Sequence, residues 1–273
     1  MNPILNLIYR KYEMNEFDIC FGTNKMDKNS ISLAIESGYK YLDTATGYNN
    51  ASIIKEAING KKIMIIGKFN PFDFTNQFDN IVDNYINDLG QIPDIVLLHS
   101  PLSLDSDYLI GDTNEKNLLA FEKLRKKFPC SQIGVSNFSI PQIQYLLNHN
   151  VIVDCIELEL SPYYQPLKLI SFCFEMNIKI YSYRLTSKSA VFNDQKLKHI
   201  SMKYGISVME LLINWCLNQK ICPIISSKNP KNIKNNISLK KIQLTKEDCI
   251  QINALNKGDQ GSTCMLSYTQ HDY

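Results

Sequence analysis

The sequence predicts one (β/α)8 barrel, a TIM barrel, over residues 1–273, and three observations support this prediction. The chain has 273 residues, which suits a single barrel domain of about 250 residues. Short apolar runs typical of parallel strands buried on both faces recur along it. Segments with helical periodicity separate these runs, without a linker or a break in composition.

Eight apolar runs are expected to form the barrel strands. Each is a short stretch rich in Ile, Val, Leu or Cys that ends near a polar residue. In chain order they are residues 18–23, 39–44, 62–68, 94–100, 131–137, 153–159, 178–183 and 222–227. Most are continuously apolar rather than alternating, so we expect a sheet covered on both faces.

The helices are expected in the segments between the strands. The first opens with cap-type residues and stops at Gly38, and the second places its apolar residues on one face before Gly90. In order, the segments are 27–38, 76–90, 115–128, 139–150, 166–177, 207–219 and 229–237. Residues 1–16 are expected to form a β-hairpin that closes the bottom of the barrel.

A doubly wound parallel sheet is the alternative fold. That fold usually carries a glycine-rich turn, G-x-G-x-x-G, after its first strand. The sequence contains no such motif. The barrel is therefore the preferred prediction.

Composition argues against several classes of protein. The 29 basic and 27 acidic residues are interspersed, so no basic stripe indicates a nucleic-acid partner. The eight cysteines form no C-x-x-C pair, which gives no support for a metal site and favours buried thiols in a reducing compartment. No apolar run reaches the length of a membrane span, and the N-terminus does not resemble a secretory signal. We expect a cytoplasmic monomer without a membrane partner.

Ionisable residues at the strand ends are the candidates for chemistry, because active sites of such barrels lie at the carboxyl ends of the strands. The second strand ends at Asp43 and is followed by Tyr48, the third ends at Lys68, and the fourth reaches His99. Each alone is more often a turn, strand-end or packing residue than a functional one. Their convergence on one end of a barrel favours a single active site.

Carbonyl reduction is the chemistry that uses this set of side chains. A hydride arriving at a carbonyl carbon leaves negative charge on the oxygen, which a proton donor must meet. Tyr48 would supply the proton, and the ammonium of Lys68 would lower the phenol pKa from about 10. Asp43 would keep Lys68 charged, while His99 would hydrogen-bond the carbonyl oxygen and orient the substrate. No metal is required.

Four motifs resemble those of the aldo-keto reductase family. GYKYLDTATGYNN is similar to the family's G-Y-R-x-I-D-T-A-x-x-Y-x-N, and IGVSNF contains G-V-S-N-F without change. IIGKFNP resembles the strand bearing the family lysine, and VLLHSP resembles L-x-H-x-P. The similarity runs from about residue 21 to about residue 255. It places the family's catalytic tetrad on Asp43, Tyr48, Lys68 and His99.

The resemblance also implies a nicotinamide cofactor. In the family, the Ser and Asn of G-V-S-N-F bind the carboxamide, and an aromatic ring near the end of the seventh strand, here Tyr181, stacks on the nicotinamide. The segment 225–236 occupies the place of the family's adenosine-phosphate site, and a polar helix start suits an anion. The cofactor-binding residues expected are Gly22, Thr23, Asp43, Ser136, Asn137, Glu157, Tyr181, Ser182, Arg184, Ser226, Ser227, Lys228, Asn232, Asn235 and Asn236.

The chain departs from the family pattern around this cofactor site. Glu157 stands where the family has a glutamine that contacts the carboxamide, and an ionised carboxylate there would favour the oxidised, cationic ring. The family's S-P-L-G turn reads S-Y-R-L, so Arg184 is expected to meet a phosphate. Ser226 and Asn232 replace the lysine and arginine that grip phosphate in the family. The remaining lysines favour NADPH, and NADH is the alternative.

The substrate pocket is also expected to differ. Tryptophans that follow the first and fourth strands in the family are replaced by small polar residues, so the pocket should be more polar or wider. The expected substrate-binding residues are Asn24, Tyr48, His99 and Ser100. The C-terminal tail either closes over the pocket through Met265 or Tyr268, or is a loosely ordered terminus.

Three functions are consistent with the sequence. The leading one is an NAD(P)H-dependent reductase of a small aldehyde or ketone. The second is a catalytically weak or inactive cofactor-binding or regulatory protein on the same scaffold, which the changes at Glu157, Tyr183 and Asn232 favour. The third is a barrel lyase or isomerase that uses Lys68 as a Schiff-base amine. The complete tetrad favours the first.

Overall fold

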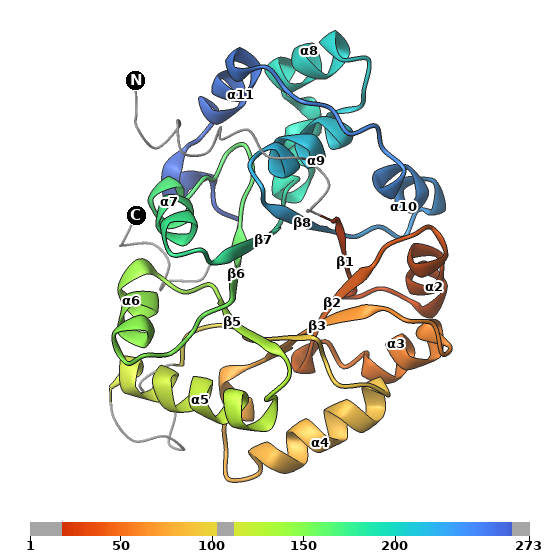
Figure 1. The fold of residues 1–273 in the computed structure, drawn as a ribbon. Coiled ribbons are helices and arrows are strands. Elements are labelled where there is room, and N and C mark those ends of the chain that lie inside the picture. The colour runs from red at the N-terminus through yellow and green to blue at the C-terminus, as the bar shows by residue number, and fades with distance from the viewer. Residues whose placement is uncertain (1–17, 103–111, 264–273) are drawn as a thin grey trace.

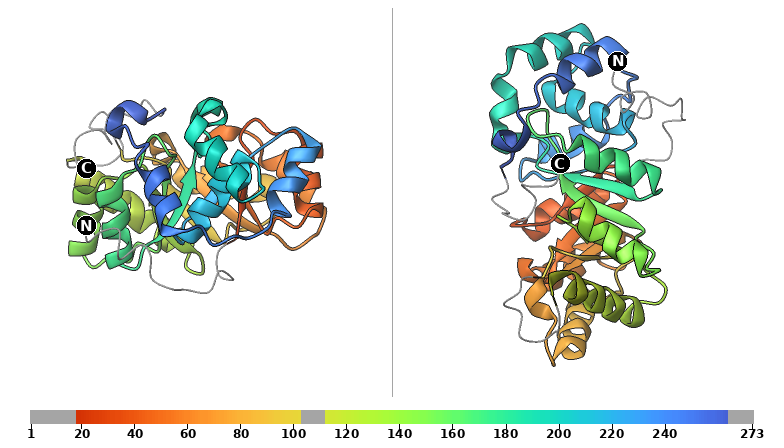
Figure 2. Two further views of the ribbon diagram at one scale, coloured as in Figure 1. Left: turned by 90° about the horizontal axis from the view of Figure 1, so that it is seen from above. Right: turned by 90° about the vertical axis from the view of Figure 1, so that its left-hand side faces the viewer.

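Eight parallel strands close into a barrel in the computed structural model, which describes residues 18–102 and 112–263. Figure 1 shows the strands at the centre with the helices around them, and the two turned views of Figure 2 also place the helices outside the strands. Each strand pairs with its neighbour in the chain, and β1 pairs with β8. The predicted (β/α)8 barrel is confirmed, and the doubly wound alternative is wrong because the sheet has no open edge.

Each of the eight strands lies within its predicted run or extends one residue beyond it. They are β1 (Cys20–Gly22), β2 (Tyr41–Ala45), β3 (Met64–Phe69), β4 (Ile95–Leu98), β5 (Gln132–Ser136), β6 (Cys155–Glu159), β7 (Lys179–Tyr183) and β8 (Cys222–Ile225). Their residues are almost all buried on both faces, as expected when helices cover one face and barrel-interior side chains cover the other.

Ten α-helices lie in the part of the chain that the structure describes. They are α2 (Lys28–Glu36), α3 (Ala51–Ile58), α4 (Phe78–Leu89), α5 (Thr113–Lys127), α6 (Ile140–Asn148), α7 (Leu167–Glu175), α8 (Gln195–Lys203), α9 (Val208–Asn218), α10 (Pro230–Ile237) and α11 (Lys246–Asn253). No helix is predicted from the sequence at α3, α8 or α11. Each of the three buries one side against neighbouring elements, which supports a short helix.

The core has two parts. The larger part lies between strands and helices and contains most of the buried aliphatic and aromatic side chains. The smaller part fills the barrel and consists of Cys20, Ile66, Ile95, Leu97, Cys155, Tyr181, Cys222 and Ile224. This filling closes the lower barrel interior, so a ligand can be received only above it.

The cysteines follow the prediction of buried thiols with one exception. All seven described cysteines are free, and six are buried, while Cys130 is exposed in the turn before β5. The predicted N-terminal hairpin (residues 1–16) and the tail residues Met265 and Tyr268 lie outside the described residues. No helix within the described ranges is long and apolar enough to cross a membrane.

Candidate active site

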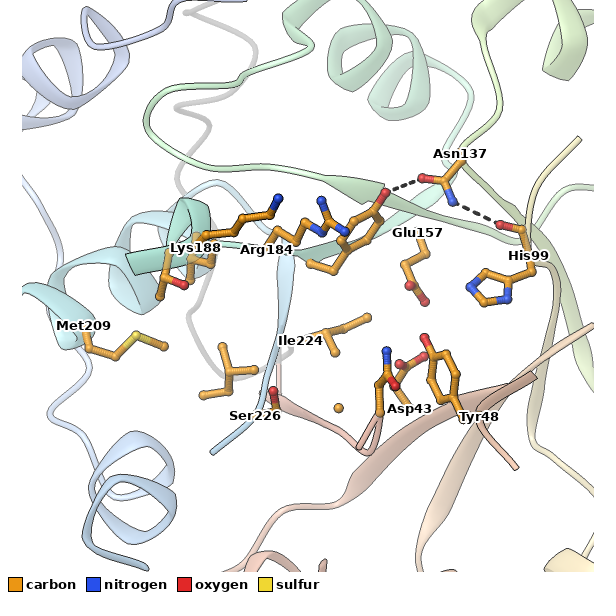
Figure 3. A pocket seen from close by; sticks show the side chains of 16 residues that line it. Asp43, Tyr48, His99, Asn137, Glu157, Arg184, Lys188, Met209, Ile224 and Ser226 are labelled. Atoms are coloured by element: carbon orange, nitrogen blue, oxygen red, sulfur yellow. Dashed lines mark hydrogen bonds between the residues drawn. The ribbon is translucent and has the colours of Figure 1, made fainter. Parts of the chain in front are cut away.

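The four predicted catalytic side chains meet at the carboxyl ends of β2, β3 and β4. Asp43 and Lys68 belong to the strands β2 and β3, Tyr48 ends a short 3-10 helix that follows β2, and His99 directly follows β4. Figure 3 shows Asp43, Tyr48 and His99 at one end of the pocket. The structure therefore brings the tetrad together as the strand ends predicted.

Lys68 is the buried centre of this group. Its side chain is fully buried, and its Nζ forms ion pairs with Asp43 and, at 3.0 Å, with Glu157. Burial alone would lower the pKa of Lys68, but the two carboxylates outweigh it and hold the pKa well above its ordinary value. A lysine that keeps its proton is a poor nucleophile, so this environment argues against the Schiff-base hypothesis.

Tyr48 lies beside both Lys68 and His99. Nζ of Lys68 is 5.5 Å from the centre of the tyrosine ring, and the His99 ring meets it edge-on at 5.8 Å between centroids. Lys68 lowers the pKa of the phenol, as predicted, but the net fall that was expected does not occur. Burial raises the pKa of Tyr48 above its ordinary value, and Asp43 and Glu157 raise it further, against the opposing effect of Lys68. Tyr48 is therefore a neutral phenol at pH 7, the form that can donate a proton.

His99 is a neutral imidazole in this site. Burial and the nearby charge of Lys68 lower its pKa from 6.5 to about 3. Its Nδ1 is 2.8 Å from Oδ1 of Asn70, a residue just after β3 that the sequence analysis did not consider. Asn70, which is not a member of the tetrad, thus holds the His99 ring through its Nδ1.

Glu157 faces Lys68 from β6. Burial and the neighbouring Asp43 raise the pKa of this carboxyl from 4.5 to about 8, although Lys68 opposes them. A raised pKa favours the protonated carboxyl, which can donate as well as accept a hydrogen bond. The glutamate thereby regains part of the hydrogen-bonding ability of the glutamine that stands here in the resembling family.

A cavity of about 480 Å³ opens above this group, a size typical of small-molecule sites. Nine of the predicted site residues line it: Gly22, Asn24, Asp43, Tyr48, His99, Asn137, Glu157, Arg184 and Ser226. In Figure 3 it runs from Tyr48 and His99 toward Arg184 and Lys188. One end thus holds the candidate acid, and the other holds two cations.

The aromatic ring that reaches this cavity from β7 is Tyr183, which was predicted only as a departure from the family's S-P-L-G turn. Its hydroxyl donates to Oδ1 of Asn137. Tyr181, predicted to stack on the nicotinamide, lies instead in the apolar filling of the barrel, fully buried and with no hydrogen-bond partner for its hydroxyl among the described residues. That prediction needs correction: both tyrosines point into the barrel, but Tyr181 lies one layer lower.

Other predicted cofactor residues support the site from outside the cavity. The Thr23 hydroxyl donates to the backbone carbonyl of Asp43, and Ser136 accepts from the side chain of Asn137. Ser182 contacts Cys216 of α9 and so faces away from the barrel interior, because side chains alternate along a strand. A direct cofactor contact by Ser182 is therefore not supported. Ser100 is partly buried and does not line the cavity.

The predicted phosphate segment lies at the rim of the barrel. Ser226 lines the cavity, whereas Ser227 and the residues that follow it lead into α10 outside the lining. Lys228, Asn232 and Asn235 are exposed, and Asn236 is buried. Their phosphate role stays a prediction.

Lys188 is a cationic side chain at the cavity that was not predicted from the sequence. It lies on the loop after β7 and lines the cavity together with Arg184. Arg184 also donates to the backbone carbonyl of Thr263, whose own N–H donates to Glu159 at 2.8 Å. Hydrogen bonds through Thr263 thus connect the segment after β7 to the end of β6 at the rim of the barrel. No group of three or more His, Cys, Asp or Glu within residues 18–102 and 112–263 is arranged to hold a metal ion.

Comparison with known proteins agrees with this geometry. A model of the Aldo/keto reductase family matches residues 19–257, so the chain belongs to that family. Aldose reductase C of Dictyostelium discoideum is 28% identical over 261 residues, which cover 84% of this chain and 81% of that protein. The NAD(P)H-dependent D-xylose reductase I,II of Candida tropicalis is 27% identical over 280 residues, covering 86% of each.

Solved structures share the fold. The aldo-keto reductase of Bombyx mori, solved in complex with NADP, superposes with a TM-score of 0.76 at 24% identity, covering 88% of this chain and 89% of that one. An aldo/keto reductase of Brucella melitensis superposes with a TM-score of 0.75 at 25% identity, covering 87% and 94%.

Proposed function

We propose that this protein reduces a small aldehyde or ketone to an alcohol with a nicotinamide cofactor, and that Tyr48 donates the proton. The observation that carries the proposal is the convergence of Asp43, Tyr48, Lys68 and His99 on one end of an elongated cavity. Relatives named for aldose and xylose reduction, and a structural neighbour solved with NADP, support the same reading.

The residues present fit a nicotinamide cofactor. An elongated ligand with a reactive ring at one end and phosphates toward the other matches a cavity with Tyr48 at one end and Arg184 and Lys188 at the other. Asn137, Glu157 and Tyr183 would hold the ring, and the two cations would meet the anionic part. When bound, such a cofactor supplies the hydride. We propose NADPH as the preferred form, with NADH as the alternative.

The protein's own residues move the proton. The neutral phenol of Tyr48 donates its proton to the carbonyl oxygen as negative charge develops there. The phenolate that remains lies beside the ammonium of Lys68, whose Nζ is 5.5 Å from the ring centre, so its charge is compensated. Asp43 holds that ammonium in place.

The test compares the wild type with Tyr48→Phe in two assays. Consumption of NADPH with a panel of aldehydes should fall at least about a hundredfold in the variant. Titration of Trp215 and tyrosine fluorescence with NADPH, and separately with NADH, should show that the variant still binds cofactor. Turnover by the variant at the wild-type rate would contradict the role of Tyr48, and failure of both cofactors to bind the wild type would contradict the proposed function.

A cofactor-binding protein without turnover is the second candidate. Three hydrogen bonds occupy the side-chain amide of Asn137: it donates to the backbone carbonyl of His99 and to Ser136, and it accepts from Tyr183. Both amide protons of Asn137 are therefore occupied, so a carboxamide oxygen must displace one of these acceptors, whereas a carboxamide N–H can still reach the second lone pair of Oδ1. Tight cofactor binding without turnover on the aldehyde panel would favour this candidate.

A further inference from the structure

Three ionisable side chains meet at the base of the cavity, and their charges do not balance. The ammonium of Lys68 pairs with Asp43 and, at 3.0 Å, with Oε2 of Glu157. Each carboxyl side chain is only 5% exposed, and that of Lys68 is fully buried. One positive charge therefore faces two carboxyls, and a second positive charge or a proton is needed to make the group neutral.

Glu157 is the carboxyl placed to take that proton or charge. Burial and the neighbouring Asp43 raise its pKa to about 8, although Lys68 opposes them. The same carboxyl lines the cavity, and Figure 3 shows it directed between Tyr48 and Asp43. A ligand in the cavity can therefore reach the group that holds the proton.

The position of Glu157 in β6 also places it beside the two residues proposed to hold the nicotinamide ring. In the sheet it pairs with Ser136 of β5 and with Tyr181 of β7. Asn137 directly follows the first of these partners, and Tyr183 lies two residues after the second. Both line the cavity together with Glu157. The carboxyl is thus part of the same end of the cavity as the proposed ring site.

The other groups around Glu157 do not offset its charge. Lys68 is the one cation that pairs with it in the part of the chain that the structure describes. The uncharged ionisable groups nearby are Cys20, Tyr48, His99, Cys155 and Tyr181. Burial raises the pKa of the thiols and phenols and lowers that of the histidine to about 3. These five groups therefore stay neutral near pH 7, and the carboxyl pair alone titrates there.

We propose that the carboxylate of Glu157 takes either a proton or the positive charge of an oxidised nicotinamide ring, so that binding of the oxidised cofactor releases a proton to solvent. The reduced ring is neutral and leaves the proton in place. The charges balance in each case, because one positive charge replaces another. This inference rests on the proposed function, since it takes the cofactor to bind with its ring at this end of the cavity.

The exchange makes the choice between the two forms of the cofactor depend on pH. A bound cation lowers the pKa of Glu157, and by the same coupling an ionised Glu157 strengthens binding of the cation. Acidic pH thus favours release of the oxidised form, which is a product of the proposed reduction, and a pH near 8 favours its retention. A glutamine at this position has no proton to exchange, so it could not provide this dependence.

Calorimetry of the wild type counts the protons directly. NADP⁺ and NADPH are each titrated into the protein at pH 7, in two buffers that differ in heat of ionisation. The phosphates of the two forms are alike, so the difference between the forms reports on the ring. We expect NADP⁺ to release about half a proton or more beyond NADPH. Equal release from both forms would overturn the proposal.

The dissociation constants of the two forms, measured at constant ionic strength, test the assignment to Glu157. In the wild type, the ratio of the Kd for NADP⁺ to that for NADPH should fall about tenfold from pH 6.5 to pH 8.5. In Glu157→Gln the ratio should change less than about twofold over this range. A pH-dependent ratio in Glu157→Gln that matches the wild type would place the exchanged proton elsewhere and refute the assignment.

Glu159 provides the matched control. It lies two residues further along β6, is equally buried and stands outside the cavity lining. Its carboxylate accepts from the Ser262 hydroxyl at 2.7 Å and from the backbone N–H of Thr263 at 2.8 Å. Glu159→Gln should keep the pH-dependent ratio, and its loss there would also refute the assignment to Glu157. Absence of binding by both forms to the wild type would contradict the proposed function itself, whereas binding of both with a constant ratio would contradict the proton exchange alone.

Discussion

The carboxyl group of Glu157 lies 3.0 Å from Nζ of Lys68, the same ammonium that pairs with Asp43. Two carboxyls therefore share one buried lysine at the base of the cavity. If both are ionised, the group carries an excess negative charge in a nearly buried site. Burial and Asp43 raise the pKa of Glu157, which favours a proton on this carboxyl and a single balanced ion pair between Lys68 and Asp43.

Replacing Lys68 should leave Asp43 and Glu157 without their cationic partner. We expect Lys68→Met to lower the free energy of unfolding by about 3–5 kcal/mol, because a buried charge loses its partner. Urea denaturation of the variant measures this loss. The double variant Lys68→Met, Glu157→Gln should lose less than the sum of the single changes, since both single changes remove the same contact between Lys68 and Glu157. Strict additivity would contradict the shared contact.

The shared proton predicts a pH dependence of stability. Glu157 has a pKa of about 8 in the fold against 4.5 in its ordinary state, so its protonated form favours folding. This contribution is complete below about pH 4.5 and is lost as the pH rises to about 8. The wild type should lose stability relative to Glu157→Gln over this interval, by at most about 1.4 kcal/mol per pH unit. Parallel Tm curves for the two proteins would refute it.

Variants of two lysines distinguish between two possible positions of the cofactor's phosphates. Lys188 lines the cavity and Lys231 lies on α10 outside it. We expect Lys188→Met to raise the Kd for NADPH about tenfold, because a charge-assisted contact is lost, and Lys231→Met to leave it close to wild type. Fluorescence titration at one fixed ionic strength measures both. A larger effect at Lys231 would favour the phosphate site that the sequence predicts at α10.

Substitution of Gly134 is expected to lower the stability of the fold severely. A Cβ at this residue would lie 2.1 Å from the backbone oxygen of Cys155, so β5 and β6 would have to separate. We expect Gly134→Ala to cost more than about 4 kcal/mol. Gly60→Ala is the matched control, because nothing lies within 4 Å of its Cβ and only its left-handed φ of 75° opposes alanine; it should cost about 1–2 kcal/mol. Similar melting temperatures for the two variants would contradict this account.

The strands were predictable because their signal is local. Each is an apolar run that ends at a polar residue, and the carboxyl ends of parallel strands share one face of a barrel. This placed Asp43, Lys68 and His99 together without any knowledge of distances. The short helix α3, which follows the motif that carries Tyr48, was missed although Ile54, Ala57 and Ile58 recur at helical spacing on its buried side.

Contacts across the barrel were not predictable in the same way. Tyr181 and Tyr183 point to the same side of β7, so the period of two residues cannot tell which one reaches the cavity. The pairing of Glu157 with Lys68 joins β6 to β3 across the barrel, and the approach of Asn70 to His99 depends on how two loops meet. The signal that was available is local: Asn70 and Asp73 form a capping box beside the lysine strand.

The lone exposed thiol among the described cysteines offers a handle for the experiments above. Cys130 lies between α5 and β5, and a turn that leads into a parallel strand is at the opposite end of a barrel from the mouth. With Cys264 replaced by serine, a maleimide dye or a surface linker should attach at that turn. The molecule can then be immobilised with its cavity facing the solution, and binding can be followed without a label near the ligand.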